Sequence, residues 1–181
     1  KPFQKPHPPI TVAVAGEETL PLIGSMGHSI FVSMNTPKEQ LTERLTSYKQ
    51  SRKESGIREP GGISIRVPVY VAETTDKAHS EPEESARHAL SYAAQELSQT
   101  AASVEAAARM HTMANTPYSE ILANRVIFGT PDEVVDRLKG LQDELGITGI
   151  VMECNYGGRI PYERVINSLS LLTEKVMPNF K

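Results

Sequence analysis

The chain has 181 residues, of which 39% are hydrophobic and 23% are charged, and its net charge is −3. This composition is typical of a soluble globular protein and excludes a disordered or fibrous chain. The near-neutral charge gives no electrostatic reason to expect a nucleic-acid partner, and no apolar run approaches the roughly 18 residues that a membrane span needs. The single cysteine, Cys154, excludes an internal disulfide framework and favours a reducing, cytoplasmic location.

The first third of the chain alternates predicted strands and helices. It opens without an initiator methionine, and its Pro-rich residues 1–9 are typical of a linker, so we expect a piece of a longer protein. The β-branched run 10–15 predicts a strand, followed by a tight turn at Gly16 and a short helix over 20–26. A second short strand is predicted over 29–33.

The middle of the chain is predicted to contain a strand between two long helices. The β-branched run 63–71 predicts this strand, in which Pro68 indicates an irregular or edge position. After it, small apolar residues recur at three- or four-residue intervals over 86–108, which predicts a closely packed helix. The helix before it is predicted over 36–56. Its sparse apolar face consists of Leu41, Leu45 and Tyr48.

The last third carries the clearest local signals. Thr130, Pro131 and Glu133 have the spacing of a capping box, with threonine at the N-cap and proline in the first turn of a helix. The apolar run 147–152 predicts a buried strand, and a final helix is predicted over 161–177. Its inward face is expected to consist of Val165, Ile166, Leu169, Leu172 and Val176.

This order of elements defines the expected fold class. Four strands that alternate with helices imply a parallel sheet with right-handed crossovers. The sheet could belong to an open doubly wound fold or to a (β/α)8 barrel of the TIM-barrel type. A complete barrel needs about 200 residues or more. About four βα units therefore amount to half of an α/β barrel.

Several motifs together resemble the bacterial luciferase-like, flavin-dependent monooxygenases. Each motif alone is common, whereas their order and spacing frame the whole chain. The resemblance implies that the chain is the C-terminal half of the barrel, with residues 75–125 as a helical insertion between the last two strands and 1–181 as one domain. The motifs are Gln4 to Ile10, Val14 to Thr19, Val69 to Thr74, Phe128 to Val134, Asn155 to Gly158 and Val176 to Pro178.

The resemblance also implies a cofactor, a reaction and partners. Family members use reduced FMN and O2 to oxygenate a small organic substrate, and a flavin reductase supplies the electrons. By position, the flavin phosphate would lie at Ala15, Gly16, Glu17 and Thr19, where the N-terminus of a helix offers N–H groups to an anion. The family's catalytic residues have no counterpart in this chain, so its catalytic group is unknown and the isolated chain is expected to be inactive.

Alternatives remain open for the cofactor and for the activity. Deazaflavin-dependent oxidoreductases share the architecture, and the chain could also be a flavin-binding or structural remnant without catalysis. Half a barrel leaves strand edges unpaired, which favours a homo-oligomer or an edge-paired dimer.

Other candidate residues also have a structural interpretation. The turn at Gly16 could be a plain helix cap, Glu73 and Glu153 could cap backbone N–H groups at strand ends, and residues 155–158 could form a simple turn. The five histidines and one cysteine have no metal-binding spacing, and we expect His88 to lie in solvent.

Overall fold

The computed structural model describes residues 3–14, 16, 18–34, 38–59, 61–99, 103 and 112–180. The contacts divide the chain into two compact units. The first unit comprises Lys1–Val67 and Lys139–Val151, and the second comprises Pro68–Leu138 and Met152–Lys181. Each unit has its own hydrophobic core, so each is described by itself.

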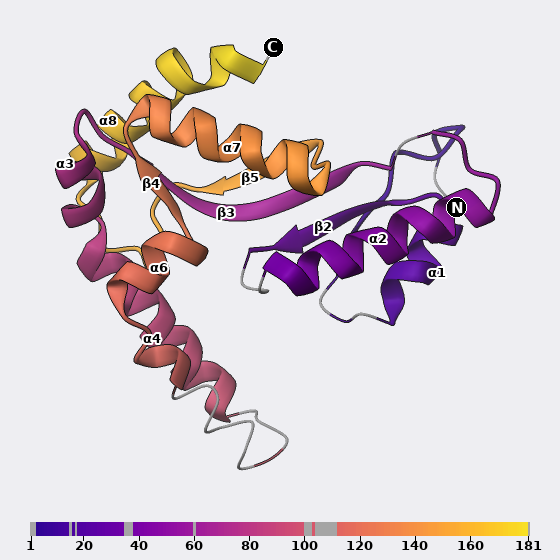
Figure 1. Ribbon diagram of the computed structural model, residues 1–181, viewed down its shortest axis with the longest axis horizontal. Helices are drawn as coiled ribbons and strands as arrows, with labels where there is room; N and C mark the ends of the chain where they lie inside the picture. Colours follow the sequence, from indigo (N-terminus) through magenta and orange to yellow (C-terminus); the bar gives the residue numbers. More distant parts are fainter. Residues whose placement is uncertain are drawn as a thin grey trace. The chain divides into compact units, whose positions relative to one another are not determined.

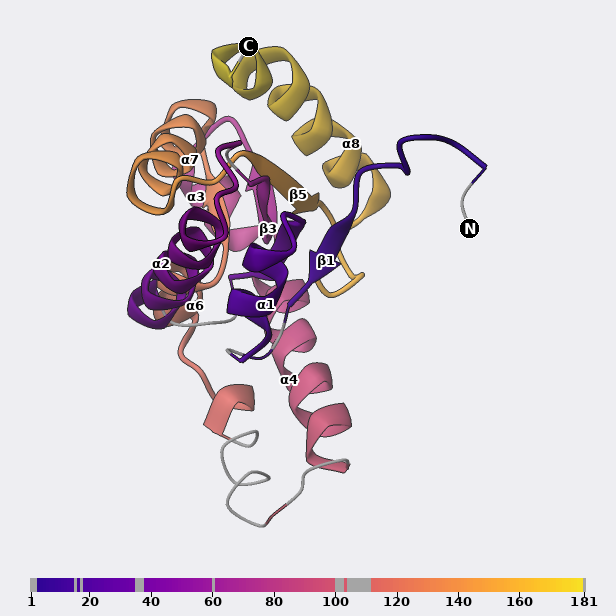
Figure 2. The same ribbon diagram turned by 90° about the vertical axis from the view of Figure 1, so that its right-hand side faces the viewer.

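The first unit is built on a parallel sheet. Strand β1 (Thr11–Ala13) pairs in parallel with β2 (Ser29–Ser33), and β2 pairs in parallel with the first half of β3 (Ile63–Val71). Strand β5 (Gly149–Glu153) also pairs with β3. The described residues before β1 are exposed and extend away from the strand (Figure 2), although the Ile10 carbonyl still accepts from the Ser29 N–H at 3.1 Å.

Two helices of the first unit pack against each other beside this sheet (Figure 1). They are α1 (Thr19–Ser25) and α2 (Lys38–Glu54). The predicted apolar face of α2 is confirmed, because all three of its residues are buried. The resulting core is almost entirely aliphatic, and consists of Leu20, Ile23, Ile30, Val32, Leu41, Leu45, Tyr48, Ile63, Ile65, Leu145 and Ile147.

Strand β3 is longer than its neighbours and takes part in both units. Its first half pairs with β2 through Arg66, whereas its second half pairs in parallel with β4 (Ile127–Gly129) from Val69 onward. The sequence left Pro68 either in an irregular strand or at an edge. The edge position is wrong, because β3 pairs with β2 before Pro68 and with β4 after it, whereas the pairing is interrupted at Pro68, which agrees with an irregular strand. The strand tolerates proline because Pro68 falls between the two paired stretches, where its missing N–H interrupts neither register.

The second unit follows β3 with helices before the chain reaches β4. These are α3 (Thr75–Ser80), α4 (Glu83–Gln99) and α6 (Tyr118–Asn124). The helix predicted over 86–108 is present as far as Gln99, and most of its remaining residues lie outside the described part of the chain. The core of the unit mixes alanines with larger residues, and consists of Tyr70, Ala72, Ala78, Ala86, Leu90, Ile121, Val126, Phe128 and Ile160.

Strand β4 corrects the expected count of strands. The described residues form five strands rather than about four, and the helical segment lies between β3 and β4 rather than between the last two strands. Three residues, Ile127 to Gly129, are too few to show the alternation that signals a strand. All three are buried because they pair with the second half of β3.

The last two helices agree with the sequence at their starts. Helix α7 (Pro131–Leu145) has the predicted capping box: Glu133 Oε2 accepts from the Thr130 N–H at 2.7 Å, and Thr130 Oγ1 accepts from the Glu133 N–H at 3.4 Å. Helix α8 (Tyr162–Leu171) continues as a π-helical turn, Leu172–Val176, and a 3-10 turn, Met177–Phe180. The expected inward position of Ile166 is wrong, because its side chain is 42% exposed. Each described helix is too short or too polar to span a membrane.

Candidate functional site

The turn after β1 is the predicted cofactor site of the first unit. The structure brings Gly16 and Thr19 together, because the Thr19 hydroxyl donates to the Gly16 carbonyl at 3.0 Å. Helix α1 begins at Thr19 and ends near Gly27, whose φ of +79° reverses the chain toward β2. The other two residues predicted here, Ala15 and Glu17, lie outside the described residues.

The described residues of this turn fit a phosphate group. Glu18 stands at the N-cap of α1 in a helical conformation and makes no capping hydrogen bond with its side chain. A Cβ atom placed on Gly16 would meet nothing within 4 Å, so one side of the turn is open. N–H groups of a first helical turn that lack a side-chain acceptor are suited to an anion. Glu18 is negatively charged and would repel an anion here, but it is exposed, so its carboxylate has room to lie in solvent.

Glu73 follows β3 in the second unit and is held by two side chains. Its carboxylate accepts from Asn167 Nδ2 at 3.0 Å and from Lys77 Nζ at 3.4 Å. These bonds, the one from Asn167 above all, hold the pKa of the Glu73 carboxyl below its usual value. A backbone N–H, that of Glu73 itself, also contributes to this lowering of the pKa, which agrees with the capping expected of Glu73. The N-cap of α3 is the neighbouring Thr74, whose Oγ1 accepts from the N–H of Lys77 at 3.3 Å. Glu153 ends β5 and is half-buried.

The loop after β5, residues 155–160, is closed by its own side chain. Asn155 Oδ1 accepts from the Ile160 N–H at 3.0 Å, which joins the two ends of the loop. Between them, Gly157 and Gly158 have φ values of +88° and +73°, in the left-handed region that glycine adopts without strain. The loop is therefore more than a plain reversal of the chain, because an amide side chain and two special backbone positions fix its shape.

Helix α4 contacts this loop through two side chains that the sequence did not single out. The Ser85 hydroxyl donates to the Tyr156 carbonyl at 2.7 Å and accepts from the Arg159 N–H at 2.9 Å. His88 Nδ1 lies 3.1 Å from the Gly157 carbonyl, so the expectation that His88 is free in solvent is wrong. No sequence signal links these residues, because about 70 positions separate them and neither belongs to a motif.

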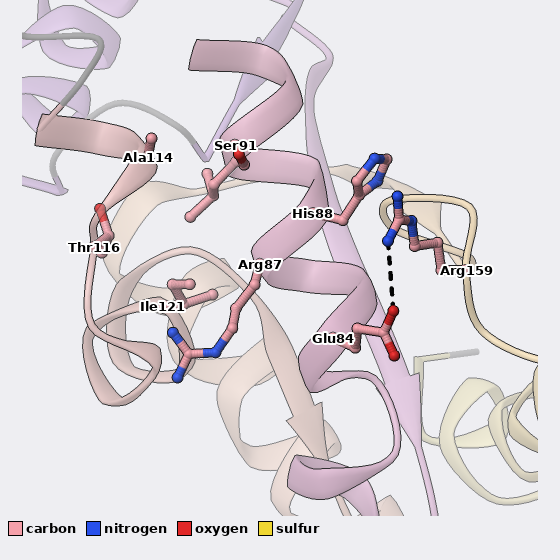
Figure 3. A pocket seen from close by; sticks show the side chains of 9 residues that line it. Glu84, Arg87, His88, Ser91, Ala114, Thr116, Ile121 and Arg159 are labelled. Atoms are coloured by element: carbon pink, nitrogen blue, oxygen red, sulfur yellow. Dashed lines mark hydrogen bonds and ion pairs between the residues drawn. The ribbon is translucent and has the colours of Figure 1, made fainter. Parts of the chain in front are cut away.

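A cavity of about 290 Å³ lies beside α4 in the second unit (Figure 3). Leu90 and Ile121 give it an apolar floor, since both side chains are almost fully buried. Figure 3 shows Arg87 directed toward Ile121, whereas His88 and Arg159 lie on the other side of the helix. An apolar floor with a few polar groups at the rim is the usual arrangement of a small-molecule site.

The charges at the rim of the cavity are already neutralised. Arg87 is paired with Glu83 at 2.8 Å and its guanidinium lies 5.3 Å from the ring centre of Tyr118. Arg159 is paired with Glu84 at 3.4 Å. The cavity therefore favours a small, mostly apolar molecule over a strongly charged one.

Two further groups have pKa values that limit what they can do chemically. Burial raises the pKa of the Cys154 thiol, so the reactive thiolate is disfavoured. Burial, followed by the hydrogen bond to Glu81, raises the pKa of Tyr70 far above its usual value, and the Tyr70 hydroxyl donates to Glu81 Oε2 at 2.5 Å. Within the described residues, no group of three or more His, Cys, Asp and Glu side chains could hold a metal ion.

Comparisons with known proteins agree with the geometry of the fold. A sequence model described as luciferase-like monooxygenase matches residues 1–149. The solved structure of monooxygenase RslO1 from Streptomyces bottropensis is 21% identical and superposes with a TM-score of 0.74 over 99% of this chain and 50% of its own. No curated protein gives a significant match.

Two other solved structures are similar to this chain. The oxygenating constituent of 3,6-diketocamphane monooxygenase from Pseudomonas putida, solved with FMN, is 16% identical with a TM-score of 0.70, over 96% of this chain and 49% of its own. The coenzyme F420-dependent tetrahydromethanopterin reductase from Methanopyrus kandleri is 18% identical with a TM-score of 0.65, over 96% of this chain and 51% of its own.

The parallel sheet, its alternating helices and these superpositions define the class of fold as a partial (β/α)8 barrel. The match over residues 1–149 covers most of the chain. The chain therefore belongs to the luciferase-like monooxygenase family. It spans about half the length of these solved relatives.

Proposed function

We propose that the chain is the C-terminal half-barrel of a flavin-dependent oxidoreductase that uses reduced FMN and O2 to oxygenate a small organic molecule. The family match over residues 1–149 carries this proposal. Similarity to two monooxygenases, one of them solved with FMN, supports it. Reduced FMN, when bound, supplies the electrons for oxygen transfer. We expect a flavin reductase to supply the reduced FMN, and we expect the reaction to take place in the cytoplasm.

In this proposal the turn after β1 holds the phosphate of the cofactor. The turn includes Ala15, Gly16, Glu17 and Thr19, and its N–H groups donate to the phosphate. The Thr19 hydroxyl has a single proton, and in the structure it donates this proton to the Gly16 carbonyl. The hydroxyl must therefore rotate before it can donate to a ligand.

A binding experiment on the isolated chain tests the assignment of the phosphate. FMN is titrated into the chain and its fluorescence is followed, with Thr19→Val as the variant and Thr46→Val as the matched control. Thr46 is an exposed helical threonine that donates to its own helix, at the Thr42 carbonyl, 2.8 Å away. We expect Thr19→Val to weaken FMN binding about tenfold or more, because one hydrogen bond to a charged group is lost. Equal affinities for the two variants would remove Thr19 from the site.

The cofactor could instead be a deazaflavin, and the F420-dependent reductase among the similar structures favours this second candidate. Direct competition between FMN and F420 for the chain decides between them. Tighter binding of F420 would overturn the choice of FMN, and binding of neither would favour a structural remnant of the fold.

We expect the isolated chain to bind flavin without turnover, because it spans about half of its solved relatives. Robust oxygen-coupled oxidation of a long-chain aldehyde by the chain with reduced FMN would contradict this expectation.

Pairing of sheet edges gives the proposed assembly. Within the described part of the chain, β1 pairs with β2 alone and β5 pairs with β3 alone, so each strand has one open edge. Val151 on β5 is 48% exposed, although parallel strands are normally covered. We expect a homo-oligomer in which these edges pair, and a monomer in sedimentation velocity at micromolar concentration would exclude it.

A further inference from the structure

A second, larger cavity of about 570 Å³ lies in the first unit. It is bordered by the last turns of α2 and by the starts of β3 and β5, where Ile63 and Thr148 line it. Its lining contains one carboxylate against four cationic side chains. The carboxylate is Glu59, and the cations are Lys49, Arg52, Lys53 and Arg58.

Arg52 is buried in the wall of this cavity without a counter-charge. Its side chain is only 6% exposed, and its guanidinium donates to the carbonyls of His28 at 3.2 Å and Glu59 at 2.9 Å. It also lies 5.6 Å from the ring centre of Tyr48. None of the described residues gives it a carboxylate within ion-pair distance, whereas buried arginines are normally paired with one.

The other three cations are only partly explained by the local fold. Lys49 Nζ donates to the Leu145 carbonyl at 2.9 Å, so it satisfies the C-terminal end of α7. Lys53 lies in the last turn of α2, where a positive charge suits the helix dipole. Arg58 lies beyond the helix. Among the described residues, neither Lys53 nor Arg58 has an ion pair or a side-chain hydrogen bond. The cavity therefore has more positive charge than its helix ends require.

We infer that this cavity binds a phosphate-bearing small molecule. Four cations around a concave site raise the local concentration of anions, and guanidinium and ammonium groups are the usual partners of phosphate oxygens. The volume of about 570 Å³ lies within the range of small-molecule sites. A phosphate would also supply the counter-charge that the buried Arg52 lacks.

This cavity is separate from the turn after β1 and does not depend on the proposed oxidoreductase. Strands β1, β2 and β3 are parallel, so their starts share one edge of the sheet and their ends share the other. The cavity adjoins the start of β3, whereas the turn at Gly16 follows the end of β1. The two sites therefore lie at opposite ends of the strands of the first unit.

Calorimetric titration of the chain with pyrophosphate tests the inference. The variant is Lys53→Ala/Arg58→Ala, and the matched control, Lys139→Ala/Lys175→Ala, removes two exposed cations that do not line the cavity. We expect pyrophosphate to bind the unmodified chain and to bind the cavity variant about tenfold more weakly or worse, with the control nearly unchanged. We also expect affinity to fall as salt is added. Circular dichroism verifies that each variant is folded.

Two outcomes would overturn the inference: no binding to the unmodified chain, or equal losses in both double variants. The exchange Lys53→Arg/Arg58→Lys keeps the charge, and it should retain binding. The same variants titrated with FMN separate a free phosphate compound from the flavin phosphate. If the cavity variant loses FMN as well, and pyrophosphate competes with FMN, the cavity holds the flavin phosphate and the assignment to the turn after β1 is overturned instead.

Discussion

The two units reach a packed core by different means. The first unit buries aliphatic side chains between a parallel sheet and the pair α1 and α2, so its core follows from local apolar patterns. The second unit has a core of alanines and larger residues, and its loops are held by bonds from side chains to distant backbone groups. Long-range bonds from side chains to the backbone occur in both units, from Lys49 to Leu145 in the first and from Ser85 to Tyr156 in the second, so the two units differ in the make-up of their cores.

Three bonds illustrate how the second unit is held together. Ser168 Oγ accepts from the N–H of Val71, 97 positions away, at 2.8 Å in a buried position. Ser85 holds the loop after β5, and Arg137 donates to the Leu122 carbonyl at 2.8 Å. Each bond gives a hydrogen-bond partner to a backbone group that would otherwise be removed from water with no partner in the folded protein. Removing one of these side chains should therefore affect the second unit without disturbing the core of the first.

The largest expected effect is at the contact between the loop after β5 and α4. A Cβ atom at Gly157 would lie 1.9 Å from the Ser85 carbonyl oxygen, and the backbone of Gly157 has a left-handed φ of +88°. Because backbone must move and the left-handed conformation is strained, we expect Gly157→Ala to lower the free energy of unfolding by about 3 kcal/mol or more. Urea denaturation followed by circular dichroism measures this change.

Gly158→Ala is the matched control for this loss. Gly158 also has a left-handed φ of +73°, but a Cβ there would meet nothing within 4 Å. Gly158→Ala therefore measures the backbone strain alone, and we expect it to lower the free energy of unfolding by about 1–2 kcal/mol. Equal losses for the two variants would mean that the close approach to Ser85 contributes nothing.

The next prediction tests the packing of the first unit. A Cβ at Gly24 in α1 would lie 2.0 Å from Ser51 Oγ and 2.7 Å from the Tyr48 carbonyl oxygen, so α1 and α2 would have to separate. We expect Gly24→Ala to cost about 2–3 kcal/mol by overpacking. Gly140, in α7, is the control, because a Cβ there would meet nothing. Gly140→Ala should instead stabilise by about 0.5–1 kcal/mol through helix propensity. If Gly24→Ala and Gly140→Ala changed the free energy of unfolding equally in urea denaturation, close packing between α1 and α2 would be contradicted.

A smaller loss is expected where a buried side chain satisfies a backbone donor. Ser168 is 3% exposed, and its removal leaves the Val71 N–H without an acceptor. We expect Ser168→Ala to lower the free energy of unfolding by about 1–2 kcal/mol. Ser170→Ala, at an exposed position of the same helix, is the control and should change stability by less than about 0.5 kcal/mol. Faster hydrogen exchange of the Val71 amide in Ser168→Ala, but not in Ser170→Ala, would show that the loss of stability arises at this bond. Unchanged exchange would contradict a hydrogen bond from the Val71 N–H to Ser168.

The local signals in the sequence were sufficient for most of the fold. The capping box at Thr130 needs only four consecutive residues, and the buried face of α2 needs only helical periodicity, so both can be predicted from the sequence. Strand β4 was missed because three residues carry no period, and it forms only because the second half of β3 lies beside it. Ile166 was placed inward by the same periodicity and is exposed, since nothing in a helix pattern specifies which neighbours cover it.

The candidate sites were less accessible to sequence reasoning. The turn at Gly16 could be proposed as a site from the sequence because its residues are close together in the chain and resemble a family motif. The contact of Ser85 with Tyr156 and the position of Arg52 beside Glu59 depend on folding, because serine and arginine occur at many surface positions of any helix. A cavity surrounded by four cations becomes visible only when the end of α2 and the starts of two strands have been placed together.

The smallest effect expected concerns acid stability at the start of α7. The Thr130 N–H bond, followed by the hydroxyl of Thr75, lowers the pKa of Glu133 from 4.5. A lowered folded-state pKa stabilises the protein above pH 4.5, and this contribution is lost as pH falls through the folded-state value. Between about pH 7 and about pH 3, we therefore expect Glu133→Gln to lose less stability than the unmodified chain.

Thermal melts at the two pH values measure this difference. The exposed Glu163 in α8 provides the control, since Glu163→Gln removes the same charge without removing a capping box. Because Glu133 lies near the surface, solvent screens its interactions and the difference should be small. If Glu133→Gln keeps the full acid sensitivity of the unmodified chain, the carboxylate contributes nothing to α7, and the start of this helix depends on Thr130 and Pro131 alone.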